Sequence, residues 1–269
     1  MIFTRQVKTP LEKELLKLDR QEKNFRSRWV GKRKPGWTGT LEHKVPEKLQ
    51  STLDKAFVKA FAVLFNKGTG VLEKTYRKDE LQKTYQVNQY ESDLRQDHKS
   101  LKRFSQGAVN TELANTLMSG VSGIGLGVLG IGLPDILVFT GFMLKGIYEI
   151  ALKFGFDYET DKERQFILLL IQGAVSEEQD FGHIDSCLNY FIEHEEFPEH
   201  VATQNRIKMA ADSLSHELLY MKFLQGIPII GVVGGAYDVV YTKRILEYAK
   251  IKYRRRFLFG EKNKNVVTN

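Results

Sequence analysis

The stretch SGVSGIGLGVLGIGLPDILVFTGFML, Ser119 to Leu144, decides how the rest of the chain is interpreted. It is apolar enough to cross a bilayer, since a membrane helix takes about 20 apolar residues. It also contains six glycines between Gly120 and Gly132, which are followed by Pro134 and Asp135. Three structures are compatible with it: a membrane span, a phosphate-binding loop, or the packed centre of a helical protein.

Three features of this stretch argue against a membrane span. Pro134 interrupts it, and Asp135 would lie near the middle of the bilayer at a cost of about 2.5 kcal/mol or more. Each glycine also weakens an isolated helix by about 1 kcal/mol relative to alanine. We therefore predict no complete transmembrane span here, nor in a later apolar stretch that Asp238 interrupts.

Phosphate binding is indicated by GLGVLG, Gly125 to Gly130, which matches the pattern G-x-G-x-x-G. A dinucleotide site also needs a preceding strand, a following helix and an acidic residue about 20 positions later. Glu149 lies at a tolerable distance, but the residues before Gly123 are typical of a helix, and Pro134 leaves little room for a helix start after Gly130. We attribute the match to local glycine richness and predict no cofactor and no metal site.

Close helix packing gives the glycines a positive role. Ser119, Gly123 and Gly127 are four residues apart, and small side chains at this spacing let a second helix backbone approach closely. Proline followed by an acid is typical of a helix start, which predicts a helix beginning at Pro134. The residues expected at helix contacts, here and in the second apolar stretch, are Gly123, Gly127, Pro134, Gly231 and Gly235.

Helical signals dominate the rest of the chain. TPLE (Thr9–Glu12) and TDKE (Thr160–Glu163) each have the form of a capping box. After Pro46, apolar residues recur every three or four positions until Gly68, which predicts an amphipathic helix ending near that glycine. No run with strand periodicity and no hairpin signal is present. The predicted fold is all-α: a single domain of about eight helices, in which the two glycine-rich apolar segments pack together.

The first forty residues differ in kind, because FRSRWVGKRKPGWTGT (Phe25–Thr40) combines five basic residues with three glycines and two tryptophans. We expect a basic arm over residues 1–40, either solvated with its tryptophans folded onto the body or docked on a surface. The helical domain is expected over residues 41–260, followed by a polar tail over 261–269. No apolar run of signal-peptide length is present at the N-terminus, which predicts a cytoplasmic protein.

The formal net charge of +7 indicates an anionic partner. The second apolar stretch, GIPIIGVVGGAYDVVYTKRILEYAKIKYRRRFLFG (Gly226–Gly260), becomes strongly basic toward its end. Its basic residues are Lys243, Arg244, Lys250, Lys252, Arg254, Arg255 and Arg256, and only Glu247 opposes them. Tyr248, Tyr253 and Phe257 are interleaved and suit a headgroup boundary. We predict that these residues bind an anionic membrane surface, and that glutamine at the three consecutive arginines weakens binding without unfolding.

Several stretches resemble the EcsC protein family. GLPDILVFTGFMLKGIYEIALKFGFD (Gly132–Asp157), followed by ERQFILLLI, is similar to the hallmark region of that family. VPEKLQSTLDKAFVKAFAVLFNKGTGVLEKTY (Val45–Tyr76) resembles its N-terminal helix, and the basic stretch resembles its C-terminal region. The resemblance covers roughly Leu41 to Phe259.

The family takes its name from a bacterial protein encoded beside an ABC transporter, and the resemblance brings no reaction, cofactor or catalytic residue with it. It implies a bacterial, cytoplasmic, mainly helical protein linked to membrane biology. We therefore predict a protein that is peripheral to the membrane and binds anionic lipid or a membrane complex such as an ABC transporter.

An enzyme is the rival hypothesis, although no catalytic motif is present. HEEFPEH lacks the form H-E-x-x-H because Pro198 takes the place of the second histidine, and no G-x-S-x-G elbow occurs. Cys187 lies on an apolar helical stripe and is expected to be buried, not nucleophilic. Nucleic-acid binding by the basic arm and tail is a weaker hypothesis, because the motifs of that class are absent.

The carboxylates in or beside the apolar segments are the residues on which an enzyme would depend. They are Asp135, Glu149, Asp157 and Asp238. Buried acids must be paired or protonated, so a site built on Asp135, Glu149 and Asp238 would have shifted pKa values. The alternative is a set of separate helix caps and salt bridges.

Overall fold

The computed structural model of the chain describes residues 8–30, 47–68, 70, 73, 77–95, 134–224 and 236–267. The helices in these ranges are α1 (Pro10–Phe25), α3 (Glu47–Val63), α5 (Lys78–Arg95), α8 (Pro134–Lys153), α9 (Asp161–Val175), α10 (Glu178–His194), α11 (Thr203–Leu224) and α12 (Ala236–Val267). Two π-helical turns, η1 (Arg26–Val30) and η2 (Leu64–Gly68), extend α1 and α3. The described ranges contain no strand, so the predicted all-α fold of about eight helices is confirmed.

Helix boundaries follow local signals in the sequence. α1 starts with the predicted capping box: the Thr9 hydroxyl accepts from the Glu12 amide at 3.2 Å, and the Glu12 carboxylate accepts from the Thr9 amide at 2.8 Å. η2 ends at Gly68, where a stop was predicted, and α8 begins at Pro134. The other predicted contact residues lie outside the described residues: Gly123, Gly127, Gly231 and Gly235.

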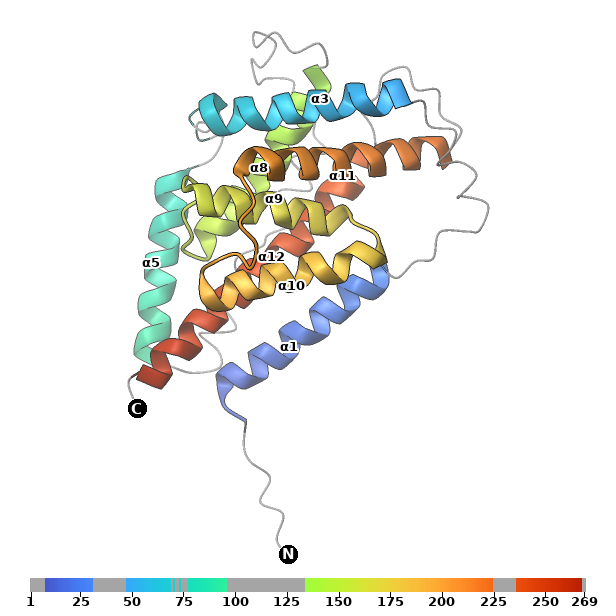
Figure 1. The fold of residues 1–269 in the computed structure, drawn as a ribbon. Coiled ribbons are helices and arrows are strands. Elements are labelled where there is room, and N and C mark those ends of the chain that lie inside the picture. The colour runs from blue at the N-terminus through green and yellow to red at the C-terminus, as the bar shows by residue number, and fades with distance from the viewer. Residues whose placement is uncertain are drawn as a thin grey trace, which may run out of the picture.

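The longest described helix, α12, runs diagonally through the bundle (Figure 1). It contacts α1, α8, α9 and α10, so helices from distant parts of the chain meet on it. Its contact with α8 is close, because a Cβ at Gly146 would lie 2.6 Å from Cδ2 of Leu246. α8 and α12, the helices that follow the two glycine-rich stretches, therefore pack together, whereas the glycine-rich stretches themselves lie outside the described residues.

The remaining helices surround this pair. α3 and α11 lie side by side along the upper edge of the bundle, and α11 also packs on α9 (Figure 1). α3 contacts α8, where the rings of Phe57 and Phe139 meet edge to face at 6.2 Å. α5 packs on α8 as well, and its Tyr85 ring covers a turn in which Gly155 adopts φ +82°.

Residues 8–30, which lie within the arm predicted over residues 1–40, pack on the helical body; residues 1–7 and 31–40 lie outside the described part of the structure. The ring of Phe25 stacks on Tyr248 of α12 at 4.9 Å. The Trp29 indole donates to Glu247 at 3.1 Å, and Arg28 donates to the same carboxylate at 3.1 Å. At the other end, α12 continues to Val267 through most of the predicted polar tail.

No helix in the described ranges combines the length and the apolar content that a bilayer crossing requires. In the apolar stretch Ser119–Leu144, residues 119–133 lie outside these ranges, and the remaining residues form the first half of α8.

Candidate functional site

The seven basic residues expected on an exposed membrane face have very different positions in α12. Lys243 is exposed, whereas Lys250, Arg255 and Arg256 are half-buried. Arg244, Lys252 and Arg254 are buried, with 5%, 0% and 2% of their surface exposed. The interleaved aromatic residues Tyr248, Tyr253 and Phe257 are also buried. Most of this charge therefore lies inside the fold.

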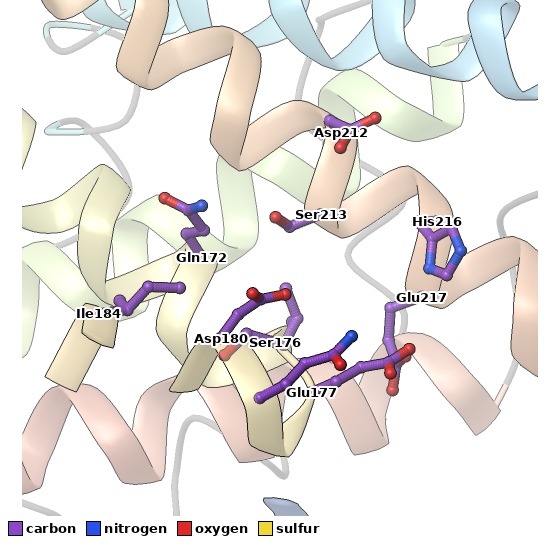
Figure 2. A pocket seen from close by; sticks show the side chains of 11 residues that line it. Gln172, Ser176, Glu177, Asp180, Ile184, Asp212, Ser213, His216 and Glu217 are labelled. Atoms are coloured by element: carbon purple, nitrogen blue, oxygen red, sulfur yellow. The ribbon is translucent and has the colours of Figure 1, made fainter. Parts of the chain in front are cut away.

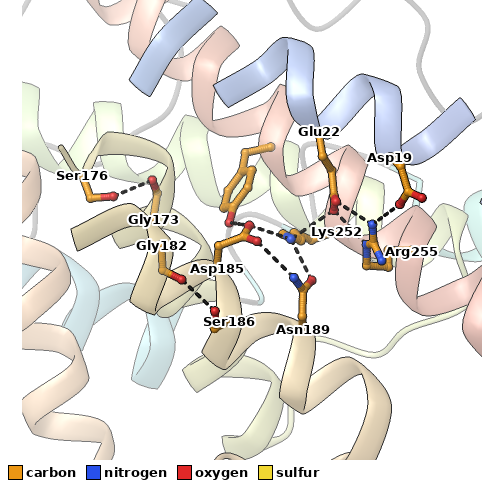
Figure 3. Close-up of polar contacts among 11 residues, drawn as sticks. Asp19, Glu22, Gly173, Ser176, Gly182, Asp185, Ser186, Asn189, Lys252 and Arg255 are labelled. Carbon is orange, nitrogen blue, oxygen red and sulfur yellow. Dashed lines mark hydrogen bonds and ion pairs between the residues drawn. The ribbon is translucent and has the colours of Figure 1, made fainter. Parts of the chain in front are cut away.

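Lys252 is the centre of a polar cluster between α12, α10 and α1 (Figure 3). Its ammonium nitrogen lies 2.7 Å from Asp185 and 2.8 Å from Asn189 of α10, and 3.1 Å from Glu22 of α1. Tyr248 donates to the same Asp185 carboxylate at 2.6 Å. Burial alone would raise the pKa of Asp185, but the Lys252 ammonium, the Tyr248 hydroxyl and the Arg255 charge together outweigh burial and hold that pKa below its ordinary value.

Arg254 and Arg255 bind carboxylates of α1. Arg254 pairs with Glu14, of whose surface only 1% is exposed. Arg255 donates to Asp19 at 2.6 Å and to Glu22 at 2.5 Å. The acids Glu14, Asp19 and Glu22 of α1 thus form ion pairs with two consecutive arginines of α12. These ion pairs link the two helices.

Arg256 points toward α9 instead of α1. Its guanidinium nitrogen lies 2.6 Å from Glu163, which is 3% exposed, and Tyr253 donates to that carboxylate at 2.6 Å. The guanidinium carbon is also 4.1 to 5.3 Å from the ring centres of Phe156, Phe166 and Phe191. Cation–π contacts of this kind favour a guanidinium over an ammonium.

This ion pair explains why the second predicted capping box is only half formed. The Thr160 hydroxyl accepts from the Glu163 amide at 3.2 Å, as a helix cap should. The Glu163 carboxylate turns inward to Arg256 and does not reach back to the backbone of Thr160. A tertiary partner has therefore displaced the local one.

We call these paired groups the α12 charge network; its members are Glu14, Asp19, Glu22, Glu163, Asp185, Lys252, Arg254, Arg255 and Arg256. Their burial corrects the expectation of an exposed basic face on α12. It also corrects the expectation that glutamine is tolerated at the three consecutive arginines. Removing one partner of a buried ion pair leaves an uncompensated charge, which costs about 3–5 kcal/mol.

Of the four carboxylate candidates, the structure describes the side chains of Glu149 and Asp157, and each has a partner within its own segment. Glu149 lies 3.9 Å from Lys145 one turn earlier in α8. Asp157 is exposed and accepts from the Glu159 amide at 3.0 Å, so it stabilises a turn and is not a buried acid. The side chains of Asp135 in α8 and Asp238 in α12 lie outside the described part of the structure.

An acidic cavity of about 290 Å³ opens between the end of α9, the start of α10 and α11 (Figure 2). Ser176, Glu177 and Asp180 face Asp212 and His216 across it. Among the described residues, no group of three or more histidine, cysteine or acidic side chains has a geometry that could hold a metal ion. The cavity is therefore an acidic surface pocket with no evident chemistry.

Cys187 is buried, as the apolar stripe predicted. Its sulfur lies 3.8 Å from Nε2 of His183. Burial raises the pKa of the Cys187 thiol, with a further contribution from Glu199, so the thiolate is disfavoured. This placement fits a structural cysteine.

The exposed basic surface lies instead on α3. Its inward face is apolar and includes Leu53, Phe57 and Phe61, which are buried. Its outward face carries Lys48, Lys55 and Lys59, all exposed. Spacings of seven and four residues place these lysines on one helix face, which we call the α3 lysine face. The apolar stripe of this helix was predicted from the sequence, whereas the lysines on the opposite face were not. The same three- and four-residue periodicity reveals the stripe and the lysines.

The α3 lysine face has little acidic compensation within its own helix. Glu47, in the first turn, is the one exposed acid of α3, whose residues are all described. Asp54 is half-buried and points to α11, where the Ser215 hydroxyl donates to it. Among the residues of α3 itself, the exposed lysines therefore outnumber the exposed acids.

A model of the EcsC protein family matches residues 11–258. The chain belongs to the EcsC protein family. No match was found among curated proteins or among solved structures. The EcsC match begins within α1 and ends within α12, so all members of the α12 charge network lie inside it. It therefore begins earlier than residue 41, where the sequence predicted the start of the helical domain.

One pH-dependent property of this EcsC protein follows from the contact between α3 and α11. Burial raises the pKa of Asp54, partly offset by the hydrogen bond from Ser215. An acid whose pKa is higher in the folded state adds stability below its ordinary pKa, and that contribution is lost as the pH rises through the raised value. Asp54→Asn keeps the acceptor oxygen and does not ionise, so we expect an unchanged or higher Tm at neutral pH. The difference in Tm between Asp54→Asn and the wild type should become smaller in acid. Ser215→Ala, which removes the hydrogen bond to Asp54, should lower the Tm.

Proposed function

We propose that the protein associates peripherally with membranes and uses the α3 lysine face to bind a surface of anionic lipid headgroups. The observation that carries this proposal is the exposed alignment of Lys48, Lys55 and Lys59 on the outer side of α3. A basic residue near an anionic leaflet contributes about 1 kcal/mol, so three together supply about 3 kcal/mol.

The neighbourhood of the α3 lysine face supports a membrane over a water-soluble anion. α3 contacts the first half of α8 through Phe57 and Phe139. The sequence that leads into α8 contains no lysine or arginine from Phe104 onward, and Glu112 is its one acid before Asp135. Residues 225–235, which lead into α12, carry no charge. Exposed lysines and long apolar stretches with almost no charge, in one chain, are the composition expected of a protein that binds a bilayer surface.

Membership in the EcsC family is consistent with this proposal, because the family name refers to a protein encoded beside an ABC transporter. Binding of the membrane surface would bring the protein close to such a complex. The lipid contact is the part that the α3 geometry supports directly.

The test is sedimentation with vesicles of phosphatidylcholine and phosphatidylserine in equal parts, compared with phosphatidylcholine alone. The wild-type protein should bind the anionic vesicles and release them as salt screens the charges. Lys48→Gln, Lys55→Gln and Lys59→Gln together should weaken binding about tenfold or more.

The control variant removes the same number of charges elsewhere: Lys13→Gln, Lys23→Gln and Lys83→Gln, at exposed positions of α1 and α5. It should bind as the wild type does. Equal loss in the two triple variants would mean that only net charge matters, and equal binding to neutral vesicles would refute the proposal.

A further inference from the structure

A second cationic surface lies beneath α1. Lys252, Arg254 and Arg255 form it on α12, and Glu14, Asp19 and Glu22 of α1 cover it (Figure 3). Every one of these three cations contacts at least one carboxylate of α1. The negative groups of α1 therefore occupy the positions where any other anion would bind this part of α12.

Charge and apolar contacts both hold α1 in place, since its ion pairs lie beside the buried Leu18 and Phe25, and Leu11 and Leu15 pack against the core. Of its sixteen residues, only Glu14, Leu18 and Phe25 are buried, and one of those three is an acid of the charge network. α1 lies at the periphery of the bundle and runs alongside α12 (Figure 1). Sixteen residues of sequence, 31–46, separate η1 from α3.

We propose that the face of α12 beneath α1 is a second binding surface for anionic phospholipid, which α1 covers in the free protein and uncovers at the membrane. This proposal rests on the proposed membrane association. A phosphate offers an arginine the same charge and the same pair of acceptor oxygens as a carboxylate. Lipid headgroups can therefore replace Glu14, Asp19 and Glu22 without leaving a cation unpaired.

The groups that remain after the exchange suit a bilayer interface. Lys252 keeps its contact with Asp185 of α10, so its charge stays neutralised. Tyr248 and Phe181, which lie against the ring of Phe25, would become available at the headgroup boundary. The membrane displaces α1 only if anionic lipid binds the uncovered protein more tightly than the covered protein. The cations of α12 that become exposed provide this higher affinity.

The variant that tests this weakens the cover and keeps the buried pair of Glu14 and Arg254: Asp19→Asn and Glu22→Gln in the full chain. With the same anionic vesicles, it should bind about tenfold more tightly than the wild type, because fewer contacts oppose exposure of α12. A matched variant, Asp79→Asn with Glu193→Gln, makes the same charge change at exposed acids away from α12. Equal gains in both variants, or no gain in the first, would overturn the proposal.

Hydrogen exchange on the wild-type protein gives a second readout that does not depend on any variant. Backbone amides of α1 should lose protection when anionic vesicles are added and keep it with neutral ones. If the amides of α1 kept their full protection on anionic vesicles, the proposal that α1 uncovers α12 at the membrane would be refuted. If instead the wild type and the α3 lysine variant bind vesicles equally, the proposed function of the α3 lysine face fails independently. Tighter binding of the uncovered variant to DNA than to vesicles would overturn the assignment to lipid.

Discussion

Replacing Arg256 with glutamine is expected to lower the free energy of unfolding by about 3–5 kcal/mol. Glu163, which is 3% exposed, would lose its cation and keep only the hydroxyl of Tyr253. The contacts of the guanidinium with Phe156, Phe166 and Phe191 would be lost at the same time. Chemical denaturation of the purified variant measures the effect directly.

The control for this substitution is Lys243→Gln, which changes the same charge on an exposed position of the same helix. Its free energy of unfolding should stay within about 0.5 kcal/mol of the wild-type value. If Arg256→Gln were as well tolerated as Lys243→Gln, the pairing of Arg256 with Glu163 would not be part of the native fold.

Gly155→Ala is expected to destabilise the protein by about 2–4 kcal/mol, since backbone strain and overpacking add. Gly155 has φ +82°, a conformation that residues with a Cβ rarely adopt. The added Cβ would also lie 2.2 Å from Cζ of Tyr85, so the ring of Tyr85 would have to move. This movement would weaken the packing of α5 on α8. Thermal unfolding should show the loss.

Gly182→Ala is the matched comparison and should have the opposite sign. Gly182 lies inside α10, and nothing is within 4 Å of the position that a Cβ would take. Alanine is favoured over glycine within a helix by about 1 kcal/mol, so the Tm should rise. A similar loss in both variants would contradict the close contact between Tyr85 and the turn.

The helices were predictable because their signals are local. The capping box at Thr9, the apolar stripe that ends at Gly68 and the helix start at Pro134 each depend on residues within a few positions of one another. The glycines that permit close helix contact among the described residues, Gly146 and Gly173, were not singled out. Which glycine meets a neighbouring helix depends on how the helices are placed, which periodicity alone does not specify.

The candidate site was predicted less well, because the partners of α12 are far away in the sequence. Seven cations opposed by one acid have the composition of a surface for anions, whether the anions are lipids or other parts of the chain. Arg254 pairs with Glu14 across 240 positions, and Arg256 pairs with Glu163 across 93. No local spacing relates such residues. One available signal was the acidic side of α1, whose Glu14, Asp19 and Glu22 fall within three helical turns.

The position of α12 in the chain has a consequence for synthesis in the cell. The ribosome makes α12 after every helix that it contacts, and at 5–20 residues per second α12 follows α1 by roughly 10–50 s. Until then the nascent chain must keep the carboxylates of α1 and α10 hydrated, because their cations do not yet exist. α9 forms contacts with α10 and with α11, which follow it closely in the sequence, so these contacts can form early. Completion of the fold therefore waits until α12 has been made, and a chain stalled before residue 252 would expose the carboxylates of α1 without their partners on α12.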